Sequence, residues 1–301
     1  MTLSQSRANA TRLAVWVAAA RPRTLSMALA PVFAGACLAG NFAEYIDFPA
    51  VIVAALSAVC IQIATNLFND ARDFERGGDG PDRLGPQRAA ASGWLAPGEV
   101  KNAAFGFFAL ATLGGLYLVV VGGWPILLLG LFSILSGYAY SGGPAPISHS
   151  PFGELFVIAF FGLGAVGGTF WLAAHDFGAS PLLAGLALGL FAAAVLMVNN
   201  YRDAAADARN GRRTLAIVAG PRASRLLFAA MMAAPFAILA GLVALTPHRA
   251  LWLAYGALPM AFIQVRRIYA EAPGPGLNLL LARTAQVQAL YALLLGIGAL
   301  V

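Results

Sequence analysis

Two short polar segments, each at the end of a long apolar run, carry side chains that could hold a cation. They contain, in chain order, Asn66, Asp70 and Asp73, then Asn199, Asp203 and Asp207. Successive residues of each trio are three or four positions apart, so on a helix each trio lies along one face. Seven of the 13 acidic residues fall in or just after these segments, among them Glu75, Asp79 and Asp82. This concentration predicts a shared function for the two segments.

A divalent metal ion explains the aligned aspartates best. Carboxylates at the ends of membrane helices repel one another, and placing one near the bilayer centre costs about 2.5–3.5 kcal/mol. The available ligand atoms are oxygens, with no Cys or His nearby, which favours Mg²⁺ shared with substrate phosphates. The alternative, ordinary polar caps of membrane helices, would explain one such segment better than two. We therefore expect two Mg²⁺ sites, one at Asp70 and Asp73 and one at Asp203 and Asp207, with Asn66 and Asn199 completing or orienting the metal shells.

The composition places these segments in a membrane protein. The chain is 60% hydrophobic and 11% charged, and its mean hydropathy is +0.76, far outside the range of soluble domains. Nine apolar runs are long enough for membrane helices, which need roughly 17–25 residues. They cover residues 24–41, 49–69, 102–121, 124–141, 154–174, 180–199, 223–245, 249–265 and 281–300. We expect an all-α, multi-pass membrane protein with a single domain over residues 1–301.

The basic residues predict the orientation of the chain. If the spans alternate, all but Arg249 of the 19 Lys and Arg residues lie on one side, which marks that side as cytoplasmic. We expect an inner-membrane protein with its N-terminus inside and both acidic segments open to the cytoplasm. The net charge of +6 then reflects this topology and a cationic entrance, with no case for nucleic-acid binding. The first residues lack the pattern of a removable signal peptide.

The acidic segments follow the second and sixth spans, which suggests an internal repeat of four helices with a ninth helix added. Spans two and six would then face each other across a central cavity. An ion-coupled transporter would also use intramembrane carboxylates and a repeat, but it predicts acids near the midplane. A lipid-binding scaffold would need no aligned aspartates. The sequence carries no indication of oligomeric state.

Several stretches of the chain together match one known group of enzymes. They are Arg21–Leu25, Gln62–Asp73 with Gly77–Pro86, Tyr140–Ile147 with Pro151–Glu154, Asn199–Asp207 and Gly211–Leu215. Between about residues 20 and 220 the chain resembles the UbiA-type intramembrane aromatic prenyltransferases, most closely the branch that acts on 1,4-dihydroxy-2-naphthoate. The resemblance implies nine helices around a central cavity. It also implies Mg²⁺-dependent transfer of a polyprenyl group from a polyprenyl diphosphate to this aromatic acid, with loss of diphosphate and CO₂, to give demethylmenaquinone.

Two positions depart from the pattern of that branch. Gly77 stands where the wider superfamily often has a third acid, and His149 stands where an aromatic residue is expected. We expect His149, like His175 and His248, to be a loop residue and not a ligand. A related acceptor such as 4-hydroxybenzoate therefore stays open as an alternative to the naphthoate.

The diphosphate end of such a donor needs cationic partners. When diphosphate leaves, it leaves an allylic cation, and metal ions neutralise the charge on the leaving group. Arginines at the same mouth can make bidentate contacts to phosphate oxygens. We expect Arg23, Arg72 and Arg202 in this role, with Asn69 and Asn199 beside them. For each arginine, contact with lipid headgroups is the alternative.

The allylic cation and the aromatic acceptor need different partners. Ring faces can stabilise the cation, and Tyr140 is the strongest candidate among the aromatic residues near the mouth, which also include Tyr138, Phe152 and Trp171. Glu154 lies at a predicted helix start, where the helix dipole favours a carboxylate. It could instead hydrogen-bond the acceptor, and the sequence leaves both roles open.

Overall fold

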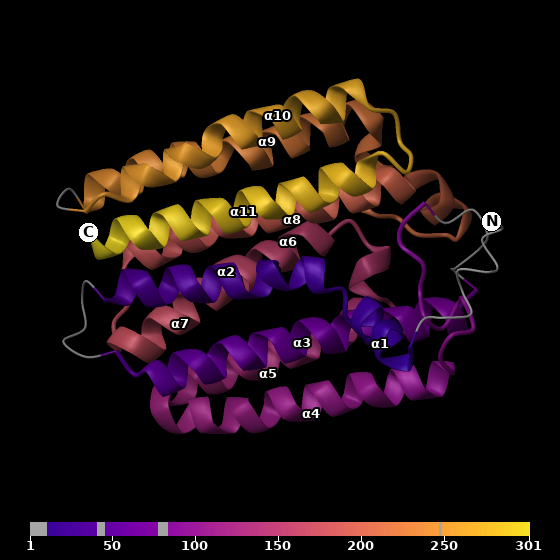
Figure 1. Cartoon of the computed structure of the whole chain (residues 1–301), viewed down its shortest axis with the longest axis horizontal. Helices are drawn as coiled ribbons and strands as arrows, with labels where there is room; N and C mark the ends of the chain where they lie inside the picture. The colour runs from indigo at the N-terminus through magenta and orange to yellow at the C-terminus, as the bar shows by residue number, and fades with distance from the viewer. Residues whose placement is uncertain (1–10, 41–45, 78–83, 247–248) are drawn as a thin grey trace.

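The computed structural model describes residues 11–40, 46–77, 84–246 and 249–301, and the regular secondary structure of these residues is helical. Most of the long helices run side by side along the longest axis of the molecule (Figure 1). The helices are α1 (Arg12–Ala20), α2 (Pro22–Ala39), α3 (Phe48–Glu75), α4 (Pro97–Gly122), α5 (Trp124–Ser141), η1 (Ile147–His149), α6 (Gly153–Val157), η2 (Ile158–Gly164), α7 (Ala165–Ala174), α8 (Ala179–Arg209), α9 (Leu215–Leu245), η3 (Leu251–Ala257), α10 (Leu258–Ala270) and α11 (Leu277–Leu300). The prediction of an all-α membrane protein is confirmed.

Each of the nine predicted apolar runs is helical, but the eighth is interrupted. In the part of the chain that the structure describes, eight helical stretches are long and apolar enough to cross a membrane. The run at 249–265 is instead divided into the 7-residue 3₁₀ helix η3 and the 13-residue α10. At roughly 2.0 and 1.5 Å per residue, the two together reach about 33 Å, close to the ~30 Å of a hydrocarbon core. Figure 1 shows α10 lying along α9.

Helices α3 and α8 continue past their apolar runs and carry the acidic segments. The side chain of Asp47 caps the start of α3 by accepting the Ala50 amide. The helix then extends to Glu75, beyond the predicted run at 49–69, and α8 extends to Arg209, beyond 180–199. Both acidic trios are therefore helical and each lies along one face, as their spacing predicted.

A close helix crossing fixes α8 against the middle of the molecule. The segment from α6 to α7 is one helical rod whose central part, η2, has π-helical hydrogen bonding. A Cβ atom on Gly162 would lie 2.3 Å from the Gly185 carbonyl oxygen, and one on Gly189 would lie 2.8 Å from that of Ile158. Glycine lets two membrane helices approach this closely. Helices α9 and α11 also pack on α8, so neighbouring helices hold α8 from several sides.

Candidate functional site

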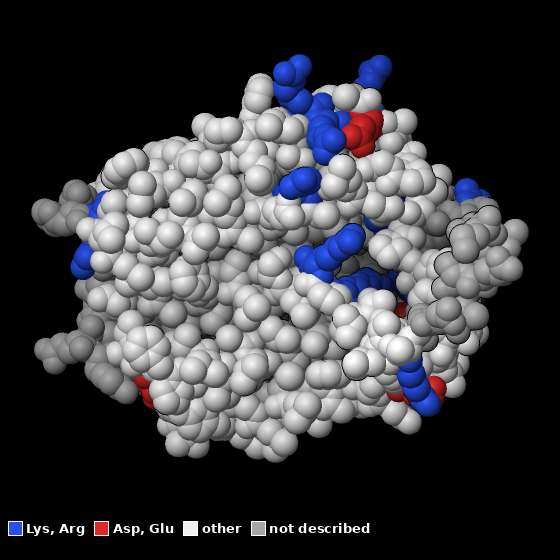
Figure 2. All heavy atoms as spheres, viewed as in Figure 1, with Lys and Arg blue, Asp and Glu red and all other residues white. Residues whose placement is uncertain are grey.

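A cavity of about 680 Å³ runs from the polar ends of α3 and α8 into the apolar interior. Helices α2 to α5 and the rod from α6 to α7 line its apolar part. Figure 2 shows a hollow with Lys and Arg side chains at its edge. The polar and aromatic side chains at the polar end include Arg21, Asn66, Asn69, Arg88, Tyr140, Asn199, Asn200, Asp203, Asp207 and Arg212. The cavity is thus amphiphilic, with charge at one end and hydrocarbon along the rest.

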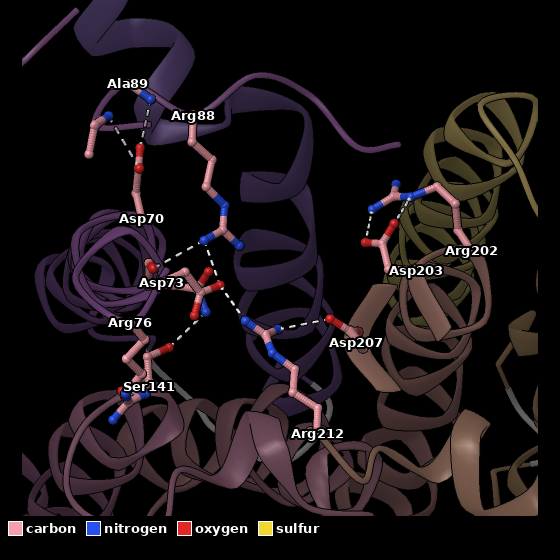
Figure 3. A network of polar contacts seen from close by, with 12 residues as sticks. Asp70, Asp73, Arg76, Arg88, Ala89, Ser141, Arg202, Asp203, Asp207 and Arg212 are labelled. Carbon is pink, nitrogen blue, oxygen red and sulfur yellow. Dashed lines mark hydrogen bonds and ion pairs between the residues drawn. The ribbon is translucent and has the colours of Figure 1, made fainter. Parts of the chain in front are cut away.

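Arg212 connects the two acidic segments. Its Nη2 atom lies 2.8 Å from Asp73 Oδ2 on α3, and its Nη1 atom lies 3.4 Å from Asp207 Oδ1 on α8. Figure 3 shows Arg212 reaching between the two carboxylates. Two backbone hydrogen bonds hold the loop after α8 in the conformation that makes this contact. The Arg212 N–H donates to the Asp207 carbonyl, and the Arg213 N–H donates to the His149 carbonyl. Helices α3 and α8 therefore face each other across the cavity mouth.

The chain that follows α3 folds back over the first acidic segment. Arg88 forms a buried ion pair with Asp73. The Asp70 carboxylate accepts hydrogen bonds from the backbone amides of Ala89, at 2.9 Å, and Ala90, at 3.3 Å. Its side chain is almost fully buried. Figure 3 shows Asp70 directed at this turn and Arg88 reaching past it to Asp73. Asp70 therefore holds the turn that presents Arg88.

In the second segment, Arg202 organises the neighbouring polar side chains. Its Nε and Nη2 atoms lie 2.8 and 2.6 Å from the two carboxylate oxygens of Asp203. The guanidinium also donates to the amide oxygens of Asn199, at 2.9 Å, and Asn278 of α11, at 2.6 Å. Asn278 in turn donates to the Leu84 carbonyl. Arg202 is buried behind the cavity wall, whereas Asp203 and Asn199 line the cavity.

The predicted asparagines of α3 both line the cavity and both anchor other elements. The side-chain amide of Asn66 donates a hydrogen bond to the Ala20 carbonyl at the end of α1, at 3.2 Å. The Asn69 amide donates to the Ser141 hydroxyl at the end of α5, at 2.7 Å, and the Asn69 carbonyl accepts from Arg88. These contacts join three helix ends around the mouth.

Tyr140 and Glu154 lie near the same polar end of the cavity. Tyr140 lines the cavity from α5. Glu154 does not line it, but its Oε1 atom accepts the amide of Asn200, a cavity residue, at 2.9 Å. The second oxygen, Oε2, is buried without a hydrogen-bond partner in the structure described. Glu154 therefore reaches the cavity through Asn200.

None of the three predicted diphosphate arginines, Arg23, Arg72 and Arg202, lines the cavity. Arg23 is exposed and outside the cavity lining, and Arg72 pairs with Glu75. Four different arginines line the cavity: Arg21, Arg88, Arg209 and Arg212. Of these, Arg212 lay inside a stretch that the sequence marked, Gly211–Leu215, whereas no local pattern marked Arg88. Asp79 and Asp82, which follow the first segment, lie outside the described residues.

Two loop residues near the mouth have shifted pKa values. Burial by itself would lower the pKa of the Arg212 guanidinium, but Asp73 and Asp207 beside it raise that pKa above its ordinary value. For His149, burial lowers the pKa, and the nearby guanidinium groups of Arg212 and Arg76 lower it further. Arg212 is therefore a permanent cation, and the His149 imidazole is neutral at neutral pH.

The donor set at the mouth fits Mg²⁺ that is shared with a substrate. Among the described residues, no three His, Cys, Asp or Glu side chains lie close enough to hold a metal by themselves. Mg²⁺ in phosphate-binding sites commonly takes only one or two carboxylates and fills its shell with phosphate and water oxygens. Asp203 and Asp207 line the cavity, and Asp73 has a buried Oδ1 atom without a hydrogen-bond partner. Such oxygen donors suit this mode of binding.

A comparison with known families identifies the fold and the class of enzyme. The sequence profile of the UbiA prenyltransferase family matches residues 28–276. The chain belongs to the UbiA prenyltransferase family. It is therefore a prenyltransferase, and an ion-coupled transporter or a scaffold is no longer needed to explain its carboxylates. The UbiA match continues well past residue 220, where the recognisable motifs end, so α9, η3 and α10 belong to the family pattern too.

Several relatives within the UbiA family share one name. Three proteins called 1,4-dihydroxy-2-naphthoate octaprenyltransferase are similar over most of their length. The one from Bacillus subtilis is 31% identical (93% of this chain, 90% of the relative). The one from Escherichia coli is 33% identical (95% of each). The one from Mycobacterium tuberculosis is 36% identical (82% and 84%).

Solved structures of UbiA homologues have the same fold. One from Archaeoglobus fulgidus, bound to DMAPP and Mg²⁺, superposes with a TM-score of 0.68 at 16% identity, covering 95% of this chain and 98% of that one. One from Aeropyrum pernix superposes with a TM-score of 0.69 at 15% identity, covering 92% and 97%. At such low identity these likenesses establish the UbiA architecture alone.

Proposed function

We propose that this enzyme transfers a polyprenyl group from a polyprenyl diphosphate to 1,4-dihydroxy-2-naphthoate, with Mg²⁺, in the inner membrane. Diphosphate and CO₂ leave, and the product is the hydroquinone form of demethylmenaquinone. The whole chain, residues 1–301, forms one domain for this reaction, and its polar mouth opens to the cytoplasm. The observation that carries the proposal is the amphiphilic cavity, because a prenyl diphosphate has the same division between a charged head and a hydrocarbon tail.

The polar end supplies both kinds of charge that a diphosphate site needs. Asp70, Asp73, Asp203 and Asp207 would hold two Mg²⁺ ions together with the diphosphate, with Asn66 and Asn199 beside them. Bound Mg²⁺ stabilises the negative charge on the departing diphosphate. Asp70 can keep its two amide hydrogen bonds in this role, because each carboxylate oxygen has two acceptor positions.

Arg88 and Arg212 are the arginines best placed to bind the diphosphate. Both line the cavity, and both are held on Asp73 by loops that follow the two acidic segments. A guanidinium forms bidentate contacts with phosphate oxygens and keeps its charge at any physiological pH. Arg202, which the sequence favoured, serves instead to orient Asp203 and Asn199. We therefore assign diphosphate binding to Arg88 and Arg212, and an orienting role to Arg202.

The acceptor lies between Tyr140 and Asn200 in this proposal. The ring of Tyr140 would face the allylic cation, while Asn200, held by Glu154, would hydrogen-bond the acceptor. The apolar walls keep water from the cation. The ring carbon that bears the carboxylate then forms a bond to the allylic carbon, and the C–C bond to CO₂ breaks and returns its electron pair to the ring. No base is required, because CO₂ leaves in place of a proton.

The names of the relatives support the naphthoate as acceptor, and an isotope experiment tests it. Purified enzyme in lipid is supplied with Mg²⁺, octaprenyl diphosphate and either 1,4-dihydroxy-2-naphthoate or 4-hydroxybenzoate, each labelled at the carboxyl carbon. We expect the naphthoate to be preferred and labelled CO₂ to appear in step with diphosphate. Label retained in a prenylated product, with 4-hydroxybenzoate preferred, would refute the proposed acceptor. Turnover without Mg²⁺ would refute the metal site.

A further inference from the structure

Glu154 is a buried carboxylate whose charge has no counter-ion in the part of the chain that the structure describes. Its side chain is 2% exposed, at the start of the rod from α6 to α7. The Asn200 amide donates to Oε1, Oε2 has no hydrogen-bond partner, and none of the described ion pairs includes Glu154. Burial of an unpaired charge is costly, and a glutamine would keep the bond to Asn200 without that cost. A carboxylate at this position therefore indicates a use for the charge itself.

The same hydrogen bond fixes which end of the Asn200 amide faces the cavity. An ionised carboxylate can only accept hydrogen bonds, so the Asn200 nitrogen turns toward Glu154, at 2.9 Å. Asn200 lines the cavity, and its Oδ1 atom is not among the buried, unpartnered atoms of the described residues. Oδ1 is therefore the end of the amide that is open to the cavity. It is a hydrogen-bond acceptor that the carboxylate behind it makes more negative, because linked hydrogen bonds polarise one another.

The 1-hydroxyl of the aromatic acid is the group that needs such a partner during the reaction. When the ring carbon that bears the carboxylate attacks the allylic cation, a π-electron pair of the ring forms the new bond. Positive charge then develops on the neighbouring carbon and on its 1-hydroxyl oxygen, whereas the 4-hydroxyl is meta to the attacked carbon and cannot share that charge. In the free acid the 1-hydroxyl donates to its own carboxylate. That bond is lost when the attacked carbon becomes tetrahedral and the carboxylate leaves the plane of the ring.

We propose that Asn200 Oδ1 accepts the hydrogen bond of the 1-hydroxyl at this moment, and that the Glu154 charge, acting through Asn200, stabilises the cationic ring. This inference rests on the proposed function, because it takes 1,4-dihydroxy-2-naphthoate as acceptor. The proton stays on the hydroxyl oxygen, and departure of CO₂ returns an electron pair to the ring. Asn200 is then a catalytic residue and Glu154 a positioning residue. Because the contact forms only in the transition state, it raises kcat and leaves KM for the naphthoate unchanged.

Two methyl ethers of the naphthoate test which hydroxyl Asn200 binds. The 1-methoxy ether still donates electrons to the ring but has no proton for Asn200, and the 4-methoxy ether carries the same methyl group and keeps the 1-hydroxyl. With wild-type enzyme, Mg²⁺ and octaprenyl diphosphate, we expect kcat for the 1-methoxy ether to be about 100-fold or more below that for the 4-methoxy ether, the size of effect of one transition-state hydrogen bond. Asn200→Ala should abolish most of this difference. Asn102→Ala, at an exposed position of α4, should keep it.

Glu154→Gln tests the charge separately from the shape, because a glutamine oxygen can still accept the Asn200 amide. We expect kcat to fall about tenfold, the lower end of the loss seen when an orienting partner is removed from a metal site, with KM for the naphthoate unchanged. In an Asn200→Ala background the same substitution should have no further effect, since the charge acts through Asn200. Glu99→Gln, at a solvent-exposed ion pair with Arg12, is the control. Equal losses in both backgrounds, or a higher KM with kcat unchanged, would overturn the role of Glu154.

The outcomes separate this inference from the proposed function. If the wild type prenylates the unmodified naphthoate but converts both ethers at the same rate, the inference is overturned and the proposed function stands. If the wild type does not prenylate the unmodified naphthoate, the proposed function is refuted, and this inference with it. The comparison of the two ethers uses the wild-type enzyme alone, so it decides between these outcomes even where the Asn200 or Glu154 variants fail to fold.

Discussion

At the scale of single residues, Arg212 is the side chain on which the two acidic segments converge. Arg212→Gln removes the charge that contacts Asp73 and Asp207, so we expect kcat/KM for the prenyl diphosphate to fall by about 100-fold, the size of effect seen when one transition-state donor is lost. Arg212→Lys should recover only part of the rate, because a lysine ammonium lacks the planar, forked donors with which the guanidinium contacts both carboxylates. Arg213→Gln is the control, because the Arg213 side chain is exposed. Equal rates for the two Gln variants would contradict the assignment.

For the aspartates of the two segments, we expect the negative charge, and not the shape of the side chain, to determine activity. Asp73→Asn and Asp203→Asn keep the side-chain volume and remove a negative charge, so we expect each to reduce turnover by at least about 100-fold and to raise the Mg²⁺ concentration needed for half-maximal rate. Initial rates over a Mg²⁺ titration provide the measurement. Asp176→Asn, at an exposed position, should behave as wild type. A variant of either site aspartate with more than a tenth of the wild-type rate would argue against two metal sites.

We expect His149 to make the stability of the enzyme depend on pH. Its folded-state pKa lies below the ordinary value of about 6.5, with Arg212, Arg76 and Asp73 as the charged groups around it. As pH falls below about 6.5, the unfolded chain takes up the proton first, so the folded state is progressively disfavoured until the folded pKa is reached. We expect Tm in detergent to fall between about pH 7 and 5.5, and to fall less in His149→Gln. The exposed His175 provides the control variant, and the same pH slope in both variants would refute this role.

At the scale of elements, the crossing of η2 and α8 is the packing contact most sensitive to added volume. Gly189→Leu would force a side chain against the Ile158 carbonyl and Gly162. Overpacking of this kind costs about 1–3 kcal/mol or more. We expect a lower Tm and a reduced yield of monodisperse protein. Gly106→Leu, where an added side chain meets open space, should leave both unchanged. If the two variants are equally stable, the crossing is looser than the structure indicates.

The elements were predictable from the sequence to the extent that the bilayer dictates them. A membrane helix must be long and apolar, so hydropathy located the long helices, although it missed the short α1. The polar extensions of α3 and α8 followed from the spacing of Asp70, Asp73, Asp203 and Asp207. The interruption at η3 was not predicted, because a 3₁₀ stretch and an α-helix have similar hydropathy. The π-helical η2 was missed for the same reason.

The arginines of the site were harder to predict than its acids. Asp73 and Arg88 are 15 positions apart, and helices α4 to α8 lie between Asp73 and Arg212 in the chain. The spacing of residues within one helix cannot reveal such contacts, because they depend on how the loops after α3 and α8 fold back onto Asp73. Arg23 and Arg72 lie inside stretches that the sequence marked, yet the first is exposed and the second pairs with Glu75.

At the scale of the whole molecule, the interrupted eighth run decides the topology. Figure 1 shows α2 beginning at one end of the molecule and α11 finishing at the opposite end, which requires an odd number of crossings. We expect alkaline phosphatase fused after Val301 to be active, and a fluorescent protein fused there to be dark, because the C-terminus would lie outside. The reverse result would mean that η3 and α10 do not cross together. Fusions within the loop between α8 and α9 should show the opposite pattern.

The ion pairs of Arg88 and Arg212 also bear on the insertion of the newly made chain into the membrane. A newly inserted chain meets the bilayer before it meets a donor or a metal, and unpaired carboxylates at that stage would each carry a penalty of about 2.5–3.5 kcal/mol if drawn toward the bilayer centre. The two loop arginines neutralise Asp73 and Asp207 from within the same chain. These carboxylates are therefore paired within the chain itself, before any donor or metal ion binds.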